Sequence, residues 1–219
     1  EYRSDAFLPR CPVDGDLLWE RLRRLVREVT RPALARLLSV VFDDPGQAAS
    51  FRLAPAAVRH HHAYLGGLLH HTVSVTERAL AMAVDGRVDR DILVTGALLH
   101  DLGKTEEYSW EGVTLGVTDR GRFVGHIALG MIKVSALAAS VPGLDGLLLD
   151  QVLHILASHH GSRDWGSPVE PCTREAMLVH MADLADSRLF KMEEARAAAL
   201  PGEKWSPMVP EMGRIWAGD

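Results

Sequence analysis

Histidine is over-represented in this chain, and it is the side chain most suited to bind transition metals and to exchange protons near neutral pH. Eleven histidines occur among 219 residues. They fall in short groups, at residues 60–62, 70–71, 100, 126, 154, 159–160 and 180. A lone histidine is usually a hydrogen-bonded core or surface residue, so only the groups and the carboxylates near them indicate chemistry.

The adjacent pair His100 and Asp101 carries the strongest chemical signal. The pair ends the apolar run ValThrGlyAlaLeuLeu and precedes LeuGlyLys, a context that packing alone does not explain. Neutral imidazole and carboxylate are natural ligands for a borderline divalent cation. Neighbouring residues on a helix point about 100° apart. At a helix end, however, both side chains can reach one ion, and the aspartate can bridge to a second.

Further ligand candidates come from the other apolar segments. Each belongs to a different predicted helix: His71, His126, His159 with His160, and Asp183. Asp183 lies in the apolar frame MetLeuValHisMetAlaAspLeuAla, where burying an unpaired charge would be costly. Metal sites in helical bundles are built in this way, from side chains that project inward from facing helices. The residues therefore predict a metal centre.

The hydrophobic pattern predicts the helices that must position these side chains. Apolar residues recur at three- and four-residue steps from Asp16 onward, as on one face of a helix. Further helices are expected over residues 32–41, 47–53, 65–84, 126–140, 144–158 and 173–199, with one capped by Asp89 or Asp91 that runs into the His-Asp pair. Residues 105–125 lack a helical period, and a short hairpin is expected near 113–123. The predicted fold class is all-α, with one irregular or hairpin segment near 105–125.

The chain is expected to hold one principal domain, as its length suggests. Residues 1–14, with Pro9 and Pro12, are expected to form an extended lead-in or linker. Residues 15–200 would form the helical domain that carries all the ligand candidates. Residues 201–219 would form a C-terminal tail.

Composition narrows the range of function classes. The formal net charge of −5 provides no global basic field for nucleic acid. The two cysteines, Cys11 and Cys172, lie far apart and indicate neither a disulfide framework nor a zinc knuckle. No apolar stretch reaches the roughly 18 residues of a membrane span, and EYRSDAFLPR lacks the layout of a signal peptide. A cytoplasmic protein with no membrane partner is expected.

The ordered series His, His-Asp, His, His-His, Asp resembles the HD superfamily of metal-dependent phosphohydrolases, in the version associated with two metals. More narrowly, HHAYLGGLLHHT, GALLHDLGK, TDRGRFVGHI, SHHGSRDWGSP and HMADLADS are similar to the HD domain of YhaM-type 3′→5′ exoribonucleases. The segments FLPRCPVDGDLLWERL and FRLAPAA are similar to the same family. The resemblance therefore extends to about residue 195. One motif alone is a weak signal, whereas the ordered set is specific.

Two features depart from that family's pattern. Its members usually carry an N-terminal OB-type domain that grips single-stranded nucleic acid, and this chain begins where the linker after such a domain would lie. We expect either a fragment or a free-standing HD enzyme. The second departure is His70, since the family more often has an acidic residue before the liganding histidine. This departure affects the expected hydrogen-bond partner of His71, whereas His71 itself is still expected to be a ligand.

The resemblance implies a division of the ligands between two divalent ions. The first would be held by His71, His100, Asp101 and Asp183, and the second by His126, His159 and His160, with Asp101 bridging. Mn²⁺ is favoured, while Fe, Co, Ni, Zn and Mg are left open. Asp186 is an alternative to Asp183 that we expect to be solvated or capping. Two ions clamp a phosphoryl group and lower the pKa of a bound water, so Asp101 is expected to be catalytic.

Substrate contacts are expected from residues around the ions. Lys104 follows Asp101 by three residues and could hold a phosphate oxygen as a point charge, a catalytic as well as a binding role. His61 and His62 match the family motif HHAY and could line the substrate channel. Arg122 could reach a phosphate, and Trp165 could stack on a base. The alternatives are a solvated loop position for the arginine and a core position for the tryptophan.

Three functions are consistent with this pattern. The first is a 3′→5′ exoribonuclease-like hydrolase acting on single-stranded nucleic acid, and the second is an HD phosphohydrolase of small nucleotides or cyclic dinucleotides. The third is a non-catalytic HD signalling module. The expected partners are single-stranded RNA or a nucleotide, and homo-oligomer formation is left open.

Overall fold

The chain folds into a helical bundle, as a computed structural model shows for residues 8–59, 61–84, 86–110 and 114–218. The all-α prediction is confirmed, and the only sheets in these residues are two short hairpins. The helices are α1 (Gly15–Arg27), α2 (Pro32–Phe42), α3 (Pro45–Leu53), α4 (Gly67–Met82), α5 (Arg90–Leu99), α6 (Lys104–Glu107), α7 (Asp119–Val124), α8 (His126–Ala138), α9 (Gly146–Ser158), the 3₁₀ turn η2 (Arg163–Trp165) and α10 (Arg174–Ala197). The strands are β1 (Tyr108–Ser109), β2 (Gly116–Val117), β3 (Trp205–Val209) and β4 (Gly213–Trp216).

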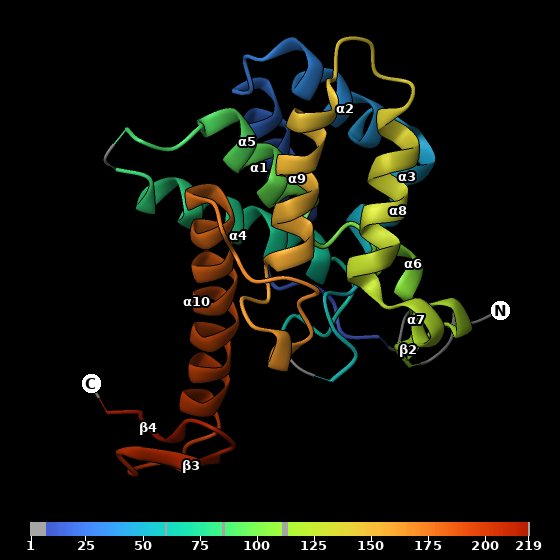
Figure 1. Cartoon of the computed structure of the whole chain (residues 1–219). Coiled ribbons are helices and arrows are strands. Elements are labelled where there is room, and N and C mark those ends of the chain that lie inside the picture. Colours follow the sequence, from blue (N-terminus) through green and yellow to red (C-terminus); the bar gives the residue numbers. More distant parts are fainter. Residues whose placement is uncertain (1–7, 60, 85, 111–113, 219) are drawn as a thin grey trace, which may run out of the picture.

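Helix α5 forms the centre of the bundle and delivers the His-Asp pair to its interior. Every residue from Asp91 to Leu99 is buried, as expected for a helix surrounded by others. It packs against α4, α9 and α10, the helices that carry most of the other ligand candidates. Figure 1 shows these helices gathered together, with α10 extending beyond the bundle. The apolar run before His100 therefore places the pair deep in the core.

Side-chain caps set where the helices begin. Asp89 accepts hydrogen bonds from the backbone N–H groups of Asp91 and Ile92 and so caps α5. Asp91 instead accepts from the backbone N–H groups of Thr30 and Arg31, joining α5 to the turn before α2. The choice between the two aspartates is thereby resolved.

The segment after the His-Asp pair is more helical than its composition indicates. Tyr108 pairs with Val117 and Ser109 with Gly116 in the antiparallel β1–β2 hairpin, which confirms a hairpin within 105–125. The predicted bounds 113–123 are wrong at both ends, because β1 lies before residue 113 and residues from Asp119 onward form α7; residue 113 itself lies outside the described residues. Helix α6 has four residues and α7 has six, so both are too short to produce a hydrophobic period.

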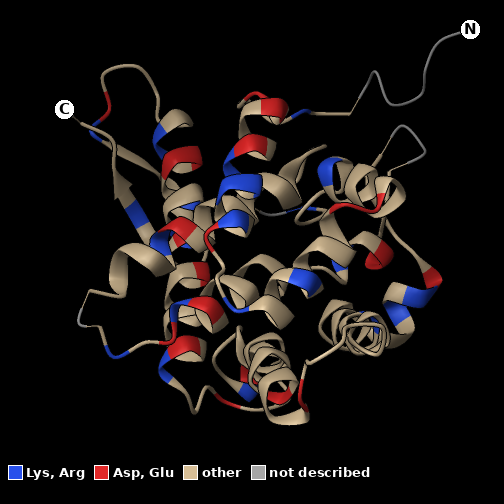
Figure 2. Cartoon of the chain, turned by 90° about the horizontal axis from the view of Figure 1, so that it is seen from above, with Lys and Arg blue, Asp and Glu red and all other residues tan. Residues whose placement is uncertain are grey.

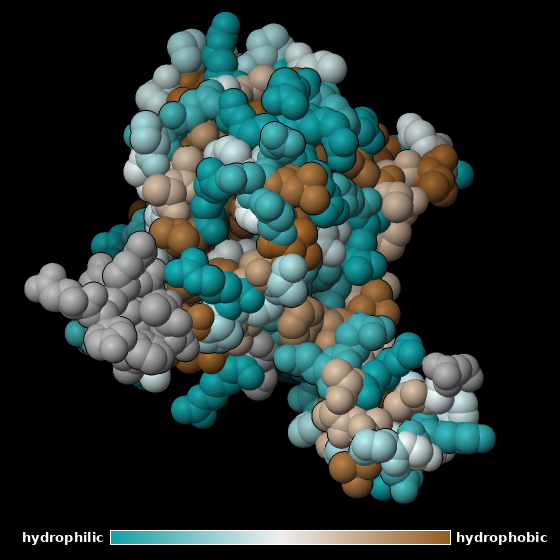
Figure 3. Space-filling model, turned by 180° about the vertical axis from the view of Figure 1, so that it is seen from behind, coloured by the Kyte–Doolittle hydropathy of each residue, from teal (hydrophilic) through white to brown (hydrophobic). Residues whose placement is uncertain are grey.

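The two ends of the described chain also form regular contacts. Residues 8–14 run beside Leu65, whose N–H donates to the carbonyl of Pro9 and whose carbonyl accepts from the N–H of Cys11, both at 2.9 Å. At the other end, β3 and β4 form an antiparallel hairpin that stands off from the bundle in Figure 3. Trp205 is 47% exposed and Met208 72% exposed on this hairpin. Residues 1–7 and 219 lie outside the described residues, as does His60.

In the part of the chain that the structure describes, charged side chains of both signs occur along the same helices. Figure 2 shows both signs interspersed along the helices, in agreement with the small net charge. Among the described residues, no helix combines the length and the apolarity needed to cross a bilayer.

Gly103 brings the end of the His-Asp segment against the start of α8. A Cβ atom at this position would lie 2.0 Å from the carbonyl oxygen of His126 and 2.5 Å from the backbone nitrogen of Gly130. We expect Gly103→Ala to lower the free energy of unfolding by about 1–3 kcal/mol, since overpacking of this size forces backbone shifts. A thermal melt would then show a Tm lower by about 2–4 °C per kcal/mol.

Gly146→Ala is the matched control for this substitution. Gly146 also begins a helix, but a Cβ there would meet nothing within 4 Å. Its Tm is expected to equal or exceed that of the wild type, because alanine is the better helix former. Equal Tm values for Gly103→Ala and the wild type would contradict the proposed close approach of α8.

Candidate metal centre

The structure brings the predicted ligands together around one carboxylate, that of Asp101. One oxygen, Oδ2, lies 3.3 Å from Nε2 of His71 and 3.3 Å from Nε2 of His100. The other oxygen, Oδ1, lies 3.6 Å from Nε2 of His126 and 3.5 Å from Nε2 of His159. Each oxygen therefore faces a separate group of histidines, which is the arrangement that a bridging ligand requires.

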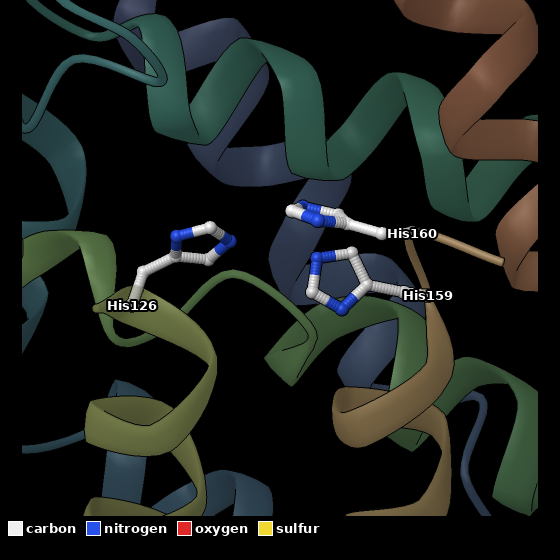
Figure 4. A group of neighbouring side chains, drawn as sticks. All are labelled: His126, His159 and His160. Atoms are coloured by element: carbon white, nitrogen blue, oxygen red, sulfur yellow. The ribbon is translucent and has the colours of Figure 1, made fainter. Parts of the chain in front are cut away.

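The remaining candidates complete the two groups. Oδ1 of Asp183, on α10, lies 3.2 Å from Nε2 of His71. His160 belongs with His126 and His159, since the nitrogens of the three lie within 4.8 Å of one another. Figure 4 shows these three rings directed toward a common space from α8 and from the end of α9. The ligand candidates therefore lie in two groups on either side of Asp101, and their division between two ions stays a prediction.

Unpartnered buried atoms indicate that a cation fits here. Among the described residues, Oδ1 of Asp101 and Nε2 of His126 and of His159 are buried without a hydrogen-bond partner. Leaving such atoms unpaired costs about 1–3 kcal/mol each. Two ligand atoms that each lie ~2.1 Å from one ion are about 3.0–3.5 Å apart, close to the separations found here. The donor set of imidazoles and carboxylates suits a divalent transition metal.

Each metal-facing imidazole is oriented through its other ring nitrogen. The Nδ1 atoms lie 2.7–3.1 Å from an acceptor: His71 from Asp186, His100 from the carbonyl of Ala97, His126 from Glu107, His159 from the carbonyl of Leu156 and His160 from the carbonyl of Trp165. A carbonyl or an ionised carboxylate cannot donate, so Nδ1 carries the hydrogen. Every Nε2 is then directed toward the centre, the usual arrangement of metal-binding histidines, although Nε2 of His71 and Nε2 of His100 lie 3.3 Å apart and share a proton in the absence of a metal.

The electrostatics keep the carboxylate ligands ionised, whereas His71 is held in its protonated form. Burial opposes protonation of His71, but hydrogen bonds to Asp101, Asp183 and Asp186 raise its pKa well above the usual range, so a metal ion would have to displace the proton on Nε2 of His71. Burial opposes ionisation of Asp101, but the Lys104 ammonium and then His100 hold the pKa of that carboxyl well below its usual range. Burial likewise opposes ionisation of Asp183, and hydrogen bonding to His71 lowers its pKa. Burial lowers the pKa of His159. Ionised carboxylates and a neutral imidazole are the forms that bind a metal.

Asp186 corrects the expectation of a solvated or capping carboxylate. It is buried, and it accepts hydrogen bonds from Nδ1 of His71 at 2.8 Å and Nε2 of His62 at 2.9 Å, and from Ser74 and Arg78. One helical turn beyond Asp183, it reaches the opposite side of the same His71 ring. The orienting partner of His71 is therefore on α10 rather than at residue 70.

The supporting roles of two carboxylates, Asp186 and Glu107, were not predicted from the sequence. The signal for Asp186 was its spacing of three residues from Asp183 on one helix, which places both on the same face. Glu107 also accepts from the N–H of His126 at 3.2 Å and so fixes the start of α8. In the sequence, the role of Glu107 was indicated only by its acidic type and its position in the irregular segment after the His-Asp pair.

A pocket of about 350 Å³ opens onto the centre. Its lining includes Asp101, His159, His160 and Asp183, together with the predicted substrate contacts His61, Lys104 and Trp165. A larger cavity of about 710 Å³ lies between residues 10–15 and α3, away from these ligands, so volume alone does not mark the site.

The structure does not bring His62 or Arg122 to this pocket, contrary to expectation. His62 is 2% exposed, and both of its ring nitrogens are hydrogen-bonded, to Tyr64 and Asp186. Arg122 is exposed on α7, outside the pocket lining. The HHAY motif places one histidine in the pocket and the next behind a metal ligand, because consecutive residues point in different directions.

Asp186→Asn should weaken metal binding by about 10–100-fold, since loss of a partner that orients a ligand has this effect. Isothermal titration of the metal-free protein with Mn²⁺ would measure the change. Asp150→Asn is the matched control. Asp150 is exposed on α9 and precedes His159 by about two and a half helical turns, so it does not support any ligand. Equal Mn²⁺ affinity in Asp186→Asn and the control would show that Asp186 does not orient His71.

Comparisons with known proteins agree with this geometry. The HD domain family matches residues 68–187, over half of the chain and a span that contains every ligand candidate. The chain is 36% identical over 205 residues to the 3′-5′ exoribonuclease YhaM of Listeria innocua, covering 91% of this chain and 63% of the relative. It is 32% identical over 200 residues to the YhaM of Bacillus subtilis, covering 91% and 62%.

The chain thus spans a little under two thirds of the length of these curated relatives. The comparison with solved structures found no significant match. The family match and the central His-Asp pair agree, and the chain belongs to the HD domain family.

Proposed function

We propose that the chain is a two-metal phosphodiesterase that shortens single-stranded RNA from its 3′ end. The observation that carries the proposal is the Asp101 carboxylate, with one oxygen facing each ligand group. Two adjacent ions activate a water as nucleophile and stabilise the attacking and leaving oxygens of an in-line displacement. We infer two bound ions, with Mn²⁺ as the favoured metal.

The roles of the ligands follow from their positions. His71, His100 and Asp183 would hold the first ion, and His126, His159 and His160 the second. Asp101 would hold both, which fixes their separation. Buried hydrogen bonds at Nδ1 of His71, His100 and His159 limit rotation of these rings, so this part of the site is organised before substrate arrives.

Three pocket residues would bind the substrate. Lys104 is buried, with Nζ 2.6 Å from Oδ2 of Asp101, and its ammonium has further N–H donors for a phosphate oxygen. Burial lowers the pKa of His61 to about 3, so its ring is neutral near pH 7. Nδ1 of His61 is buried without a partner among the described residues and could bond to a sugar or base. Trp165 is 54% exposed at the pocket and could stack on a base.

The polymer substrate is inferred from the relatives, whose name is 3′-5′ exoribonuclease. A second candidate is a phosphohydrolase of single nucleotides. It is favoured by the pocket volume of about 350 Å³, near the lower end of small-ligand sites. Both candidates use the same ions and ligands.

The free thiols of Cys11 and Cys172 support a cytoplasmic location, where thiols stay reduced.

A 5′-labelled single-stranded RNA, incubated with the protein and Mn²⁺, tests the proposal. We expect a ladder of progressively shorter labelled products with release of nucleoside monophosphates, and none of this in the presence of a chelator. A panel of nucleotides and cyclic dinucleotides is assayed in parallel. Intact RNA beside turnover of one of these small esters would replace the polymer substrate with the second candidate.

A further inference from the structure

We propose that His62 and Tyr64 are positioning residues of the metal centre, because they form a hydrogen-bonded relay that fixes Asp186 and, through it, the ring of His71. The proposal deepens the proposed function and rests on the metal site. It assigns to His62 a role behind the ions in place of a role in the substrate channel.

The relay is continuous from the His71 ring to the half-buried ring of His70. Oδ2 of Asp186 lies 2.8 Å from Nδ1 of His71 and 2.9 Å from Nε2 of His62. The Tyr64 hydroxyl lies 2.6 Å from Nδ1 of His62 and 2.7 Å from Nδ1 of His70. His62, Tyr64, His71 and Asp186 are each at most 8% exposed. Buried networks whose members are all satisfied restrict their groups to one arrangement.

The acceptor character of the Asp186 carboxylate sets the direction of every bond. A carboxylate only accepts, so His71 donates from Nδ1 and His62 donates from Nε2. In a neutral His62 ring Nδ1 is then an acceptor, and the Tyr64 hydroxyl must donate to it. The Tyr64 oxygen is left to accept from Nδ1–H of His70. No two donors meet, and Nε2 of His71 is left directed toward the centre.

The backbone of His62 adopts an uncommon left-handed conformation, which sets the direction of its side chain. Its φ is 57°, in the left-handed region where few residues other than glycine occur. The His62 carbonyl accepts from the N–H groups of Ala56 at 3.2 Å and Tyr64 at 2.9 Å. A Cβ on Gly67 would lie 2.0 Å from this carbonyl oxygen, so α4 closes over it. Such conformations persist where the surroundings enforce them and are common at functional sites.

The N-terminal lead-in and α10 enclose the relay. Leu65, the neighbour of Tyr64, is tied to Pro9 and Cys11 by two backbone hydrogen bonds of 2.9 Å. The Phe190 ring covers the His62 ring at a centroid distance of 4.4 Å. Residues 8–14 therefore help to hold the orientation of a metal ligand, although none of them reaches the centre.

The other roles open to these side chains do not fit their contacts. His62, His71 and Asp186 also have the residue types of a metal site, but their nitrogen–oxygen distances of 2.8 and 2.9 Å are those of direct hydrogen bonds, so these atoms are already paired with one another. Substrate contact does not fit, because His62 and Tyr64 are absent from the pocket lining. The role that fits the contacts of His62 and Tyr64 is to position Asp186.

The test compares Tyr64→Phe, His62→Leu and His62→Gln in the full chain. Titration of the metal-free proteins with Mn²⁺ should show affinity about 10-fold weaker for Tyr64→Phe and 10–100-fold weaker for His62→Leu. His62→Gln keeps one donor and one acceptor at the same backbone strain, so it should recover most of the affinity that His62→Leu loses. The KM for RNA should stay unchanged while kcat falls.

Two further measurements separate positioning from folding. Thr95→Val removes a buried hydroxyl that has no partner among the described residues, and it should bind Mn²⁺ like the wild type. ¹⁵N NMR of the metal-free protein should show His62 with its hydrogen on Nε2. Wild-type Mn²⁺ affinity in Tyr64→Phe, or a His62 hydrogen on Nδ1, would overturn the proposal. Both readouts are independent of RNA hydrolysis, so a wild type that binds Mn²⁺ but leaves RNA intact would refute only the proposed function.

Discussion

Asp101→Asn should abolish hydrolysis, with kcat/KM reduced by at least about 10³-fold, equivalent to ~4 kcal/mol of transition-state stabilisation. The reason is that its two oxygens face separate ligand groups, at 3.3 Å from Nε2 of His71 and 3.5 Å from Nε2 of His159. An amide has one oxygen and one NH₂ group, and the latter is a donor that cannot bind a cation. Both ions should therefore be affected by this single change.

Metal analysis of the purified variants would measure the result directly. We expect Asp101→Asn to retain fewer than one ion per chain after dialysis, and Asp183→Asn to retain one, because Asp183 contacts only the His71 side. The asparagine oxygen can still accept from Nζ of Lys104, which lies 2.6 Å from Oδ2, so the fold should persist. Two ions per chain in Asp101→Asn would show that this carboxylate does not bridge them.

His159→Ala should remove the second ion alone and lower kcat by about 10²–10³-fold, the range found for loss of one transition-state stabiliser. His159 is fully enclosed, with Nδ1 held by the carbonyl of Leu156 and Nε2 free beside Asp101. His71, His100 and Asp183 are untouched by the change. One ion per chain should therefore remain at the first position.

His154→Ala is the control on the same helix. Nε2 of His154 accepts from the backbone N–H of Cys172 at 3.0 Å and does not contact the ligands. Its metal content should equal that of the wild type, and stopped assays with RNA should show activity close to normal. Loss of both ions in His159→Ala, or normal activity in that variant, would contradict a separate second site.

The clustering of the ligand candidates was predictable from sequence because the requirements of a metal ion on its ligands are strict. A histidine or aspartate that ends an apolar run, as His100 and Asp101 do, has few explanations other than a ligand or a buried pair. The long helices α4 and α10 were predictable because each extends over several turns of the hydrophobic pattern, and α5 was predictable from its aspartate cap and its apolar run.

The supporting residues were not predictable in the same way. Whether Asp186 meets solvent or the back of His71 depends on the rotation of α10 relative to α4, which spacing within one helix does not determine. The direction of His62 depends on a left-handed backbone conformation that only the packed neighbours impose. Glu107 lies in a segment whose helices are too short for a period. These positions become visible only when the tertiary contacts are known.

Anomalous diffraction from crystals loaded with Mn²⁺ tests the central claim most directly. Two peaks about 3.5–4 Å apart are expected, with the Asp101 carboxylate between them. His71, His100 and Asp183 should bind one ion, and His126, His159 and His160 the other. A single peak, or two peaks that do not share Asp101, would contradict a two-metal centre bridged by this carboxylate.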